Sequence, residues 1–217
     1  MIKTIQPTSI PETRSTLFII DNVSWEMYEQ LLDIFAEYPA IRMTYYQGTL
    51  ELMTPLPEHE RSSWILGRLL IVLSEELGLE IIGLKSTTWR SKPKAAGKEA
   101  DECFYIQNEA KMRGKIKIDL QVDPPPDLVI EVDMTHSFID KLSVYSELKV
   151  PEIWQIKNQI LTIYLFSDEG YKKSETSLAF GTFPVKELAK FIKLDSQKGE
   201  NERMREFRQW VGLQLSK

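Results

Sequence analysis

Apolar residues recur along the chain with two spacings, and these predict helices and strands that follow one another. A spacing of three to four residues predicts helices over residues 24–38, 58–77, 136–148 and 201–215. Apolar runs and strict alternation predict strands at 41–46, 49–53, 79–89, 98–106, 128–132, 152–166 and 170–178, the sixth range being a hairpin. A strand-rich centre between helices indicates an α/β fold with a central mixed β-sheet flanked by helices.

Turn and cap residues mark the limits of several of these elements. The pair at residues 47–48 is typical of a hairpin turn, and residues 157–159 provide another. Gly78 is expected to end the helix 58–77. The basic loop 91–97 is expected to join strands 79–89 and 98–106 as a pair, and Thr135 or Ser137 is expected to cap the helix 136–148.

Length and composition limit the organisation of the chain. With 217 residues, 42% of them hydrophobic, the sequence favours a single domain over residues 1–217. Two prolines and scattered polar residues near the start do not resemble a signal peptide, and no apolar run reaches the length of a membrane span, so a cytoplasmic protein is expected. The single cysteine, Cys103, excludes an intramolecular disulfide and a thiolate metal site, and is expected to be buried.

The net charge of −5 argues against a protein that coats nucleic acid without specificity. Basic side chains gather in two stretches, and these are Lys85, Arg90, Lys92, Lys94 and Lys98, then Lys111, Arg113, Lys115 and Lys117. The simpler interpretation is that they are solvated loop charges, and the alternative is a local contact with a polyanion.

Carboxylates occupy alternate positions in and around the apolar strand 128–132. Asp127, Glu131 and Asp133 therefore share one face of that strand. In the strand 98–106, Glu99, Asp101 and Cys103 share a face in the same way. If the two strands are neighbours, Asp101 and Glu131 converge on one point.

Two or three carboxylates held on rigid strands suit Mg²⁺, which prefers oxygen ligands and keeps several waters. Such a site fits phosphoryl chemistry, in which a nearby lysine neutralises developing charge. Lys141, in the second turn of the helix 136–148, is the closest candidate in sequence. Spacing alone also allows the carboxylates to be helix caps or members of surface salt bridges.

Other polar and aromatic residues have simpler interpretations. Asp127 follows three prolines and is expected to fix the start of its strand, whereas Asp133 would assist a metal or bind the N-terminus of the next helix. His59 is expected to be a surface or structural residue of the first helical turn. The aromatic residues expected in the core are Trp64, Trp154 and Tyr145.

Three segments carry a resemblance to a known family: "GTLELMTPLPEHERSSWILGRLL", "EADECFYI" and "PPDLVIEVDMTHSFIDKLSVYSELKVPEIWQI". Over residues 46–166 the chain resembles the Uma2 family of bacterial restriction-endonuclease-like proteins, which belongs to the PD-(D/E)XK nuclease superfamily. The resemblance implies a core of a helix, a three-stranded meander, a second helix and a further strand. It also implies that Asp101 and Glu131 ligate Mg²⁺, with Mn²⁺ as a substitute. His59 and Glu60 fall at the start of the first helix, where the superfamily often places an additional acidic residue.

The sequence departs from the superfamily pattern at one position. Asp133 stands where the lysine of the motif is expected, and the resemblance assigns that role to Lys141 in the following helix. The resulting prediction is a Mg²⁺-dependent endonuclease that hydrolyses DNA phosphodiester bonds through a metal-activated water, with Asp101, Glu131, Lys141 and Asp133 as the catalytic set. A homodimer is expected, because duplex cleavage needs two active sites or two encounters. The alternative is an inactive nuclease-fold module for nucleic-acid binding or protein assembly.

Overall fold

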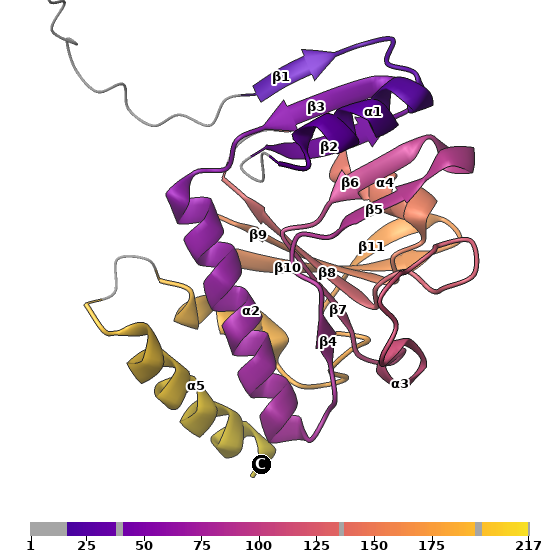
Figure 1. Ribbon diagram of the computed structural model, residues 1–217. Coiled ribbons are helices and arrows are strands. Elements are labelled where there is room, and N and C mark those ends of the chain that lie inside the picture. Colours follow the sequence, from indigo (N-terminus) through magenta and orange to yellow (C-terminus); the bar gives the residue numbers. More distant parts are fainter. Residues whose placement is uncertain (1–16, 38–40, 135–136, 194–196, 217) are drawn as a thin grey trace, which may run out of the picture.

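Two β-sheets form the centre of the molecule (Figure 1). The structure is a computed structural model, and it describes residues 17–37, 41–134, 137–193 and 197–216. The smaller sheet is antiparallel throughout and contains, in spatial order, β1 (Leu17–Ile20), β3 (Thr49–Met53), β2 (Arg42–Tyr46), β6 (Ala96–Glu99) and β5 (Thr88–Ser91). The larger sheet contains β11 (Gly170–Ser174), β10 (Ile160–Ser167), β9 (Glu152–Lys157), β8 (Leu128–Asp133), β7 (Glu102–Tyr105) and β4 (Ile82–Gly83). It is mixed, because β8 and β9 are parallel and its other pairs are antiparallel.

Helices cover the sheets from several sides. They are α1 (Trp25–Phe35), α2 (Pro57–Leu77), α3 (Glu109–Met112), α4 (Lys141–Leu148) and α5 (Glu200–Leu215), with 3₁₀ turns η1 (Lys92–Lys94) and η2 (Val185–Phe191). The long helices α2 and α5 lie side by side along one edge of the view (Figure 1). The predicted α/β class with a mixed sheet and flanking helices is confirmed.

The strand β8 separates two hydrophobic cores. Leu128, Ile130 and Val132 face the core that α2, α5 and β9 complete. Val129 faces the second core, which includes side chains of α4 and of β7. Because successive side chains point to opposite faces of a strand, Glu131 also points to the side of α4. Burial on both faces explains why this strand is a continuous apolar run in the sequence.

Several local predictions are confirmed. The β2–β3 hairpin turns at Gln47 and Gly48, both of which have positive φ angles. Gly78 ends α2 in the left-handed conformation, and its N–H donates to carbonyl groups of the last helical turn. The β9–β10 turn has two further positive φ angles, at Asn158 and Gln159, as the twist of a tight hairpin requires.

The two long strands predicted at 79–89 and 98–106 are wrong as single elements. The first is divided into β4 and β5, and the second into β6 and β7, with one half of each in each sheet. The halves β5 and β6 do pair, as expected. The chain crosses between the sheets at Lys85, which has a positive φ angle, and at the bend formed by residues 100–101. Both crossings fall in mainly polar stretches, at residues 85–88 and 98–102, where the apolar pattern does not show whether a strand continues.

The helix predicted from residue 136 begins later, at Lys141. Asp140 is its N-cap, because its carboxylate accepts hydrogen bonds from the N–H groups of Leu142 and Ser143. The predicted cap Thr135 lies outside the described residues, and the other predicted cap, Ser137, donates its hydroxyl to the Glu51 carboxylate and to a backbone carbonyl instead.

Burial confirms some of the aromatic and cysteine predictions. Trp154, Tyr145 and Cys103 are buried as expected. Trp64 is 47% exposed, so its assignment to the core is wrong. None of the helices within the described ranges is long and apolar enough to span a membrane.

Candidate active site

The candidate site lies where the chain passes from the smaller sheet to the larger one. β7 pairs with β8 in a register that sets Glu102 opposite Ile130, so the preceding residue, Asp101, lies beside Glu131. The Asp101 carboxylate confirms this placement, because its Oδ2 accepts a hydrogen bond of 2.7 Å from the N–H of Val132. The convergence of Asp101 and Glu131 that was inferred from strand pairing is therefore observed.

Glu131 is almost completely buried, at 1% exposed. Its Oε1 accepts a hydrogen bond of 2.5 Å from the Tyr145 hydroxyl. Its Oε2 lies 2.9 Å from Nζ of Lys141 and 3.3 Å from Nζ of Lys98. Two ammonium groups thus compensate a carboxylate that burial alone would make costly.

Lys141 is the first residue of α4, not a residue of its second turn. From this position its Nζ reaches back to β8, where it contacts Asp133 as well as Glu131. Burial would lower the pKa of Lys141, but the carboxylates of Glu131, Asp101 and Asp133 outweigh it and raise that pKa. The side chain therefore stays protonated and positively charged among these carboxylates.

Asp133 takes part in the same cluster. Its second carboxylate oxygen, Oδ2, accepts a hydrogen bond of 2.6 Å from the side-chain amide of Gln155 on β9. Asp133 therefore helps Glu131 to hold Lys141. It occupies the sequence position of the expected lysine, and it is in contact with the lysine that replaces it.

His59 is buried in the first turn of α2, so a surface position is wrong for it. Its Nε2 lies 3.1 Å from Oδ2 of Asp101. Burial opposes the charged imidazole, but the contact with Asp101 prevails and raises the pKa of His59. For Asp101, burial acts to raise the pKa, but His59 and then Lys141 overcome that effect and lower it, so this carboxyl group stays ionised.

Comparison of the sequence with known protein families identifies the family of this chain. Residues 25–192 match the family Uma2, whose description is "Putative restriction endonuclease". The chain belongs to the Uma2 family. No protein with a curated description matches the sequence. The match confirms the resemblance and the restriction-endonuclease-like class of the fold.

The Uma2 match spans every element of the site, from α2 through the two crossing strands to α4 and β9. One basic member of the site was not predicted. Lys98 was assigned to the solvated loop charges, which is wrong, because it is buried in β6. Besides Glu131, it contacts the backbone carbonyl of Glu99 at 3.2 Å and lies over the Tyr145 ring. The burial of Lys98 could have been inferred from strand alternation, which places it on the same face of β6 as the buried Ala96.

The predicted alignment of Glu99, Asp101 and Cys103 on one strand face is also wrong. The bend after β6 turns the Glu99 carboxylate toward the guanidinium of Arg42, which also pairs with Glu60 at 3.2 Å. Cys103 lies in the core, where the indole N–H of Trp89 donates to its sulfur. Glu99 is therefore compensated mainly by Arg42, although both residues border the same small cavity as Asp101 and Lys141.

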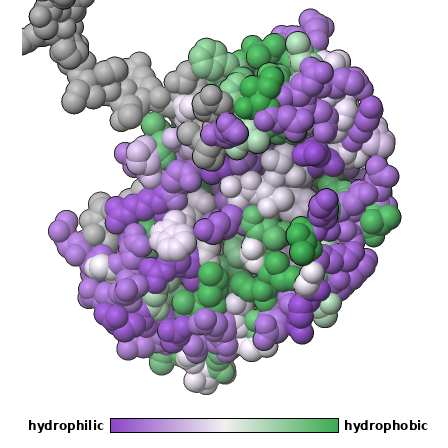
Figure 2. All heavy atoms as spheres, in the orientation of Figure 1, coloured by the Kyte–Doolittle hydropathy of each residue, from purple (hydrophilic) through white to green (hydrophobic). Residues whose placement is uncertain are grey.

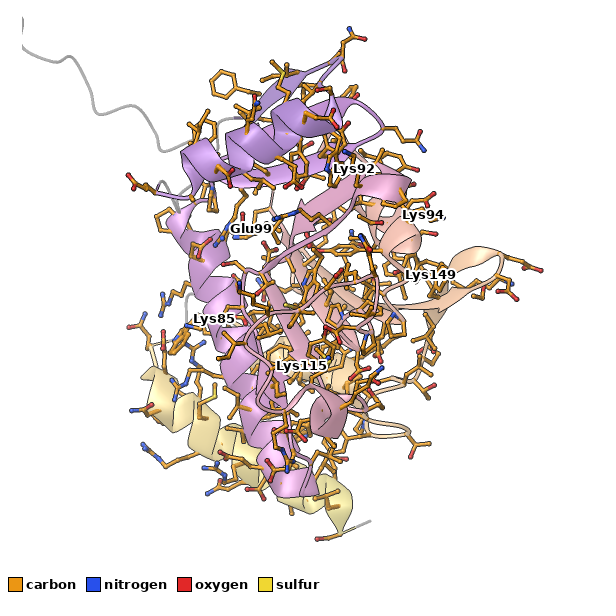
Figure 3. The ribbon with its side chains drawn as sticks, turned by 45° about the vertical axis from the view of Figure 1, so that its right-hand side comes forward. Lys85, Lys92, Lys94, Glu99, Lys115 and Lys149 are labelled. Atoms are coloured by element: carbon orange, nitrogen blue, oxygen red, sulfur yellow. The ribbon has the colours of Figure 1, made fainter. Side chains whose placement is uncertain are left out.

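The other basic residues of this Uma2 protein are mainly partners of surface carboxylates. Lys92 pairs with Glu26 at 2.8 Å, and Lys94 pairs with Glu147 at 3.3 Å. In Figure 3, Lys92 and Lys94 lie near the smaller sheet, whereas Lys115 lies far below them. Solvated charge therefore describes most of the two basic stretches.

The residues at the site can be compared with the needs of a hard divalent cation. Within the described ranges, no group of three or more His, Cys, Asp and Glu side chains surrounds one point. Mg²⁺ in phosphoryl-transfer enzymes is commonly held by one or two carboxylates, with waters and substrate oxygens as its other ligands. A cavity of about 10 Å³, room for roughly one water, borders Asp101, Lys98 and Lys141. Asp101 and Glu131 therefore fit the donor chemistry of such a cation.

Proposed function

We propose that this Uma2 protein is a Mg²⁺-dependent endonuclease that hydrolyses DNA phosphodiester bonds. The observation that carries the proposal is the cluster in which Asp101 and Glu131, from neighbouring strands, meet the charged Nζ of Lys141. The family description supports a nuclease of the restriction-endonuclease type. Buried carboxylates around a lysine, at the edge of a small cavity, are the residue types that such a reaction uses.

Each residue has a distinct proposed role. Asp101 and Glu131 would hold Mg²⁺ or Mn²⁺, which supplies a more acidic bound water and stabilises charge on the phosphate. Lys141, always protonated in this environment, donates to a phosphoryl oxygen as negative charge develops in the transition state. Asp133 orients Lys141.

Two further residues keep the acidic pair in position. The Tyr145 hydroxyl holds Oε1 of Glu131 and leaves Oε2 directed toward the lysines. His59 and the Val132 N–H hold Asp101, so that it remains ionised. Although Asp133 stands at the expected lysine position, Lys141 reaches Glu131 from α4 and places an ammonium group there. This contact weakens the motivation for an inactive nuclease-fold module.

The proposal is tested by plasmid nicking with purified protein. We expect cleavage of supercoiled DNA with MgCl₂ or MnCl₂ but not with EDTA, and at least about a hundredfold slower cleavage by Glu131→Gln. The matched control is Glu152→Gln, which changes an equally buried strand glutamate whose carboxylate binds Trp154 and the Ala179 N–H. Equal residual cleavage by wild type and Glu131→Gln, on DNA and on RNA, would exclude the endonuclease.

Metal binding is tested separately from cleavage by thermal unfolding. A ligand that binds only the folded state raises the midpoint with its concentration. We expect millimolar Mg²⁺ or Mn²⁺ to raise the midpoint of the wild type and of Glu152→Gln, but not that of Glu131→Gln. If the metal shifts the unfolding midpoint of none of the three proteins, the result argues against a metal site and favours the inactive module.

The expected homodimer stays a prediction, which sedimentation of the protein with and without DNA would test.

A further inference from the structure

A second hollow lies beside the candidate active site, between α2, β4 and β7. Its volume is about 360 Å³, which is within the range of small-molecule pockets. We call it the Trp64 groove, and the lining residues used below are Trp64, Arg68, Ile71, Lys85, Glu102 and Phe104. In Figure 2 hydrophobic side chains gather where α2 and β4 lie in Figure 1, and hydrophilic residues surround them.

Two glycines keep the floor of the groove open. A Cβ atom at Gly67 would lie 3.1 Å from Oε1 of Glu102, and a Cβ atom at Gly83 would lie 3.2 Å from the ring of Phe104. Both distances are shorter than ordinary van der Waals contact. The groove therefore depends on these two positions having no side chain.

Glu102 is the polar group of the floor. It is only 7% exposed, yet no other described residue gives its carboxyl group a hydrogen bond or an ion pair. A buried carboxyl group without a partner is costly, whereas Oδ2 of Asp101, the residue before it, accepts a hydrogen bond from the Val132 N–H and contacts His59. The unused carboxyl oxygens point to a ligand that donates hydrogen bonds to them.

The wall of the groove combines an aromatic ring with two cations. The indole N–H of Trp64 donates to Glu200 of α5 at 3.1 Å, which fixes the orientation of the half-exposed ring. Nζ of Lys85 lies 5.7 Å and Cζ of Arg68 lies 5.9 Å from its centroid. Figure 3 shows Lys85 against α2. Arg68 also pairs with Glu200 at 3.6 Å and donates to Asn201 at 2.7 Å, so its charge is partly compensated. The ammonium group of Lys85 is therefore the main charge that favours a ligand with an anionic group.

We propose that the Trp64 groove binds a nucleobase that carries a phosphate. The flat base lies against the aromatic side chains, its N–H donors meet the Glu102 carboxyl group, and Lys85 and Arg68 meet the phosphate. Guanine fits best, because its pairing edge has two adjacent N–H donors for the two carboxyl oxygens. Cytosine and adenine present one amino group, and uracil or thymine presents a single donor between two acceptors. The proposal concerns binding and does not require cleavage.

The test is titration calorimetry of the full chain in EDTA, which removes metal-dependent cleavage. The probes are GMP, AMP, CMP and UMP, and oligothymidylates of nine nucleotides with a central dG, dA, dC or dT. We expect guanine to bind most tightly and uracil or thymine most weakly. Glu102→Gln should lower the affinity for guanine about ten- to a hundredfold. Trp64→Ala should lower the affinity for every base about tenfold or more.

Controls keep the result interpretable. Phe18→Ala changes an exposed aromatic residue of β1 outside the groove and should bind as the wild type does. Gly67→Ala should also weaken binding, and far-ultraviolet circular dichroism checks that each variant is folded. Tighter binding of the dG oligonucleotide than of GMP identifies a polynucleotide as the source of the base, and equal binding identifies a free nucleotide. The proposal is overturned if no probe binds at about 1 mM, or if folded Glu102→Gln and Trp64→Ala bind every probe as the wild type does.

Discussion

Asp127 and Glu131 are two carboxylates on the same side of one segment, and they have opposite kinds of partner. Both are buried, at 4% and 1% exposed. Asp127 accepts hydrogen bonds from the N–H groups of Ile106 and Asn108, at 2.7 and 2.8 Å, and from the Asn108 side chain. Glu131 faces the ammonium groups of Lys141 and Lys98. A buried carboxylate in this strand is therefore stabilised either by fixed backbone dipoles or by mobile charges.

The difference separates structure from chemistry. Backbone donors become fixed when the chain folds, so Asp127 ties the start of β8 to the segment after β7, as the sequence predicted for a structural residue. Ammonium groups on side chains can move and can exchange one carboxylate for a phosphate. Glu131 therefore lies in a site that can respond to a ligand, whereas Asp127 lies in one that cannot.

The largest expected effect follows from removing the ammonium group of Lys141, which contacts both Glu131 and Asp133. Lys141→Met keeps most of the side-chain volume but removes the ammonium group at 2.9 Å from Glu131. We expect the rate of plasmid nicking to fall about 10²- to 10³-fold, as when one donor to a transition-state charge is removed. The matched control is Lys149→Met, an exposed lysine just after the same helix, which should leave the rate unchanged.

Stability provides a second measurement for Lys141→Met. Breaking a buried ion pair leaves a charge without compensation, which costs about 3–5 kcal/mol of unfolding free energy when nothing replaces the partner. Lys98 still faces Glu131, so the loss should be below this range. A variant that is as active as the wild type in its folded fraction would contradict the role proposed for Lys141.

Asp127→Ala should reverse the pattern, with a large loss of stability and no loss of activity per folded molecule. The substitution leaves the N–H groups of Ile106 and Asn108 without their acceptor, and each unsatisfied buried group costs about 1–3 kcal/mol. We therefore expect the free energy of unfolding in urea to fall by about 2–4 kcal/mol. A loss of nicking that exceeds the loss of folded protein would show that Asp127 belongs to the active site.

Lys98→Met should have a smaller effect than Lys141→Met. Nζ of Lys98 is more distant from Glu131, at 3.3 Å, and it comes from the smaller sheet. We expect roughly a tenfold fall in the rate of nicking, because removing one partly redundant charge changes the transition-state energy by about 1.4 kcal/mol. If Lys98→Met and Lys141→Met lose equal activity, the two lysines act as one unit. The prediction that Lys141 contributes more to the rate of nicking than Lys98 is then wrong.

The sequence predicted the parts of this site that depend on local order along the chain. The convergence of Asp101 and Glu131 was expected on the condition that their strands are neighbours, and the pairing of β7 with β8 meets that condition. Lys141 was the closest candidate in sequence, and the family resemblance gave it the role of the motif lysine. Nothing in the spacing places the first lysine of a helix against a strand. Its proximity to Glu131 is a consequence of Asp140 starting the helix at that residue.

The parts that the sequence did not predict depend on which sheet a segment joins. His59 and Lys98 look like ordinary polar residues of a helix start and a basic loop, and they are buried only because two sheets meet beside them. Trp64 was misplaced for the opposite reason. Its position in an apolar helix favoured the core, but its face of α2 borders the groove instead of the sheet.

The smallest expected effect concerns a third buried carboxylate, Glu152 of β9, and its dependence on pH. Burial raises the pKa of Glu152 above its ordinary value of 4.5, although hydrogen bonds from its neighbours oppose this. Above pH 4.5 the folded protein therefore binds this proton more tightly than the unfolded chain does, so the contribution of Glu152 to stability falls as pH rises through that window. Glu152→Gln removes this dependence on pH. The unfolding free energy of the variant minus that of the wild type should therefore increase from about pH 4.5 upward, until the pH passes the raised pKa of Glu152. Urea unfolding at intervals across that range measures the difference, and two parallel curves would mean that backbone and indole donors satisfy Glu152 as fully as they satisfy Asp127.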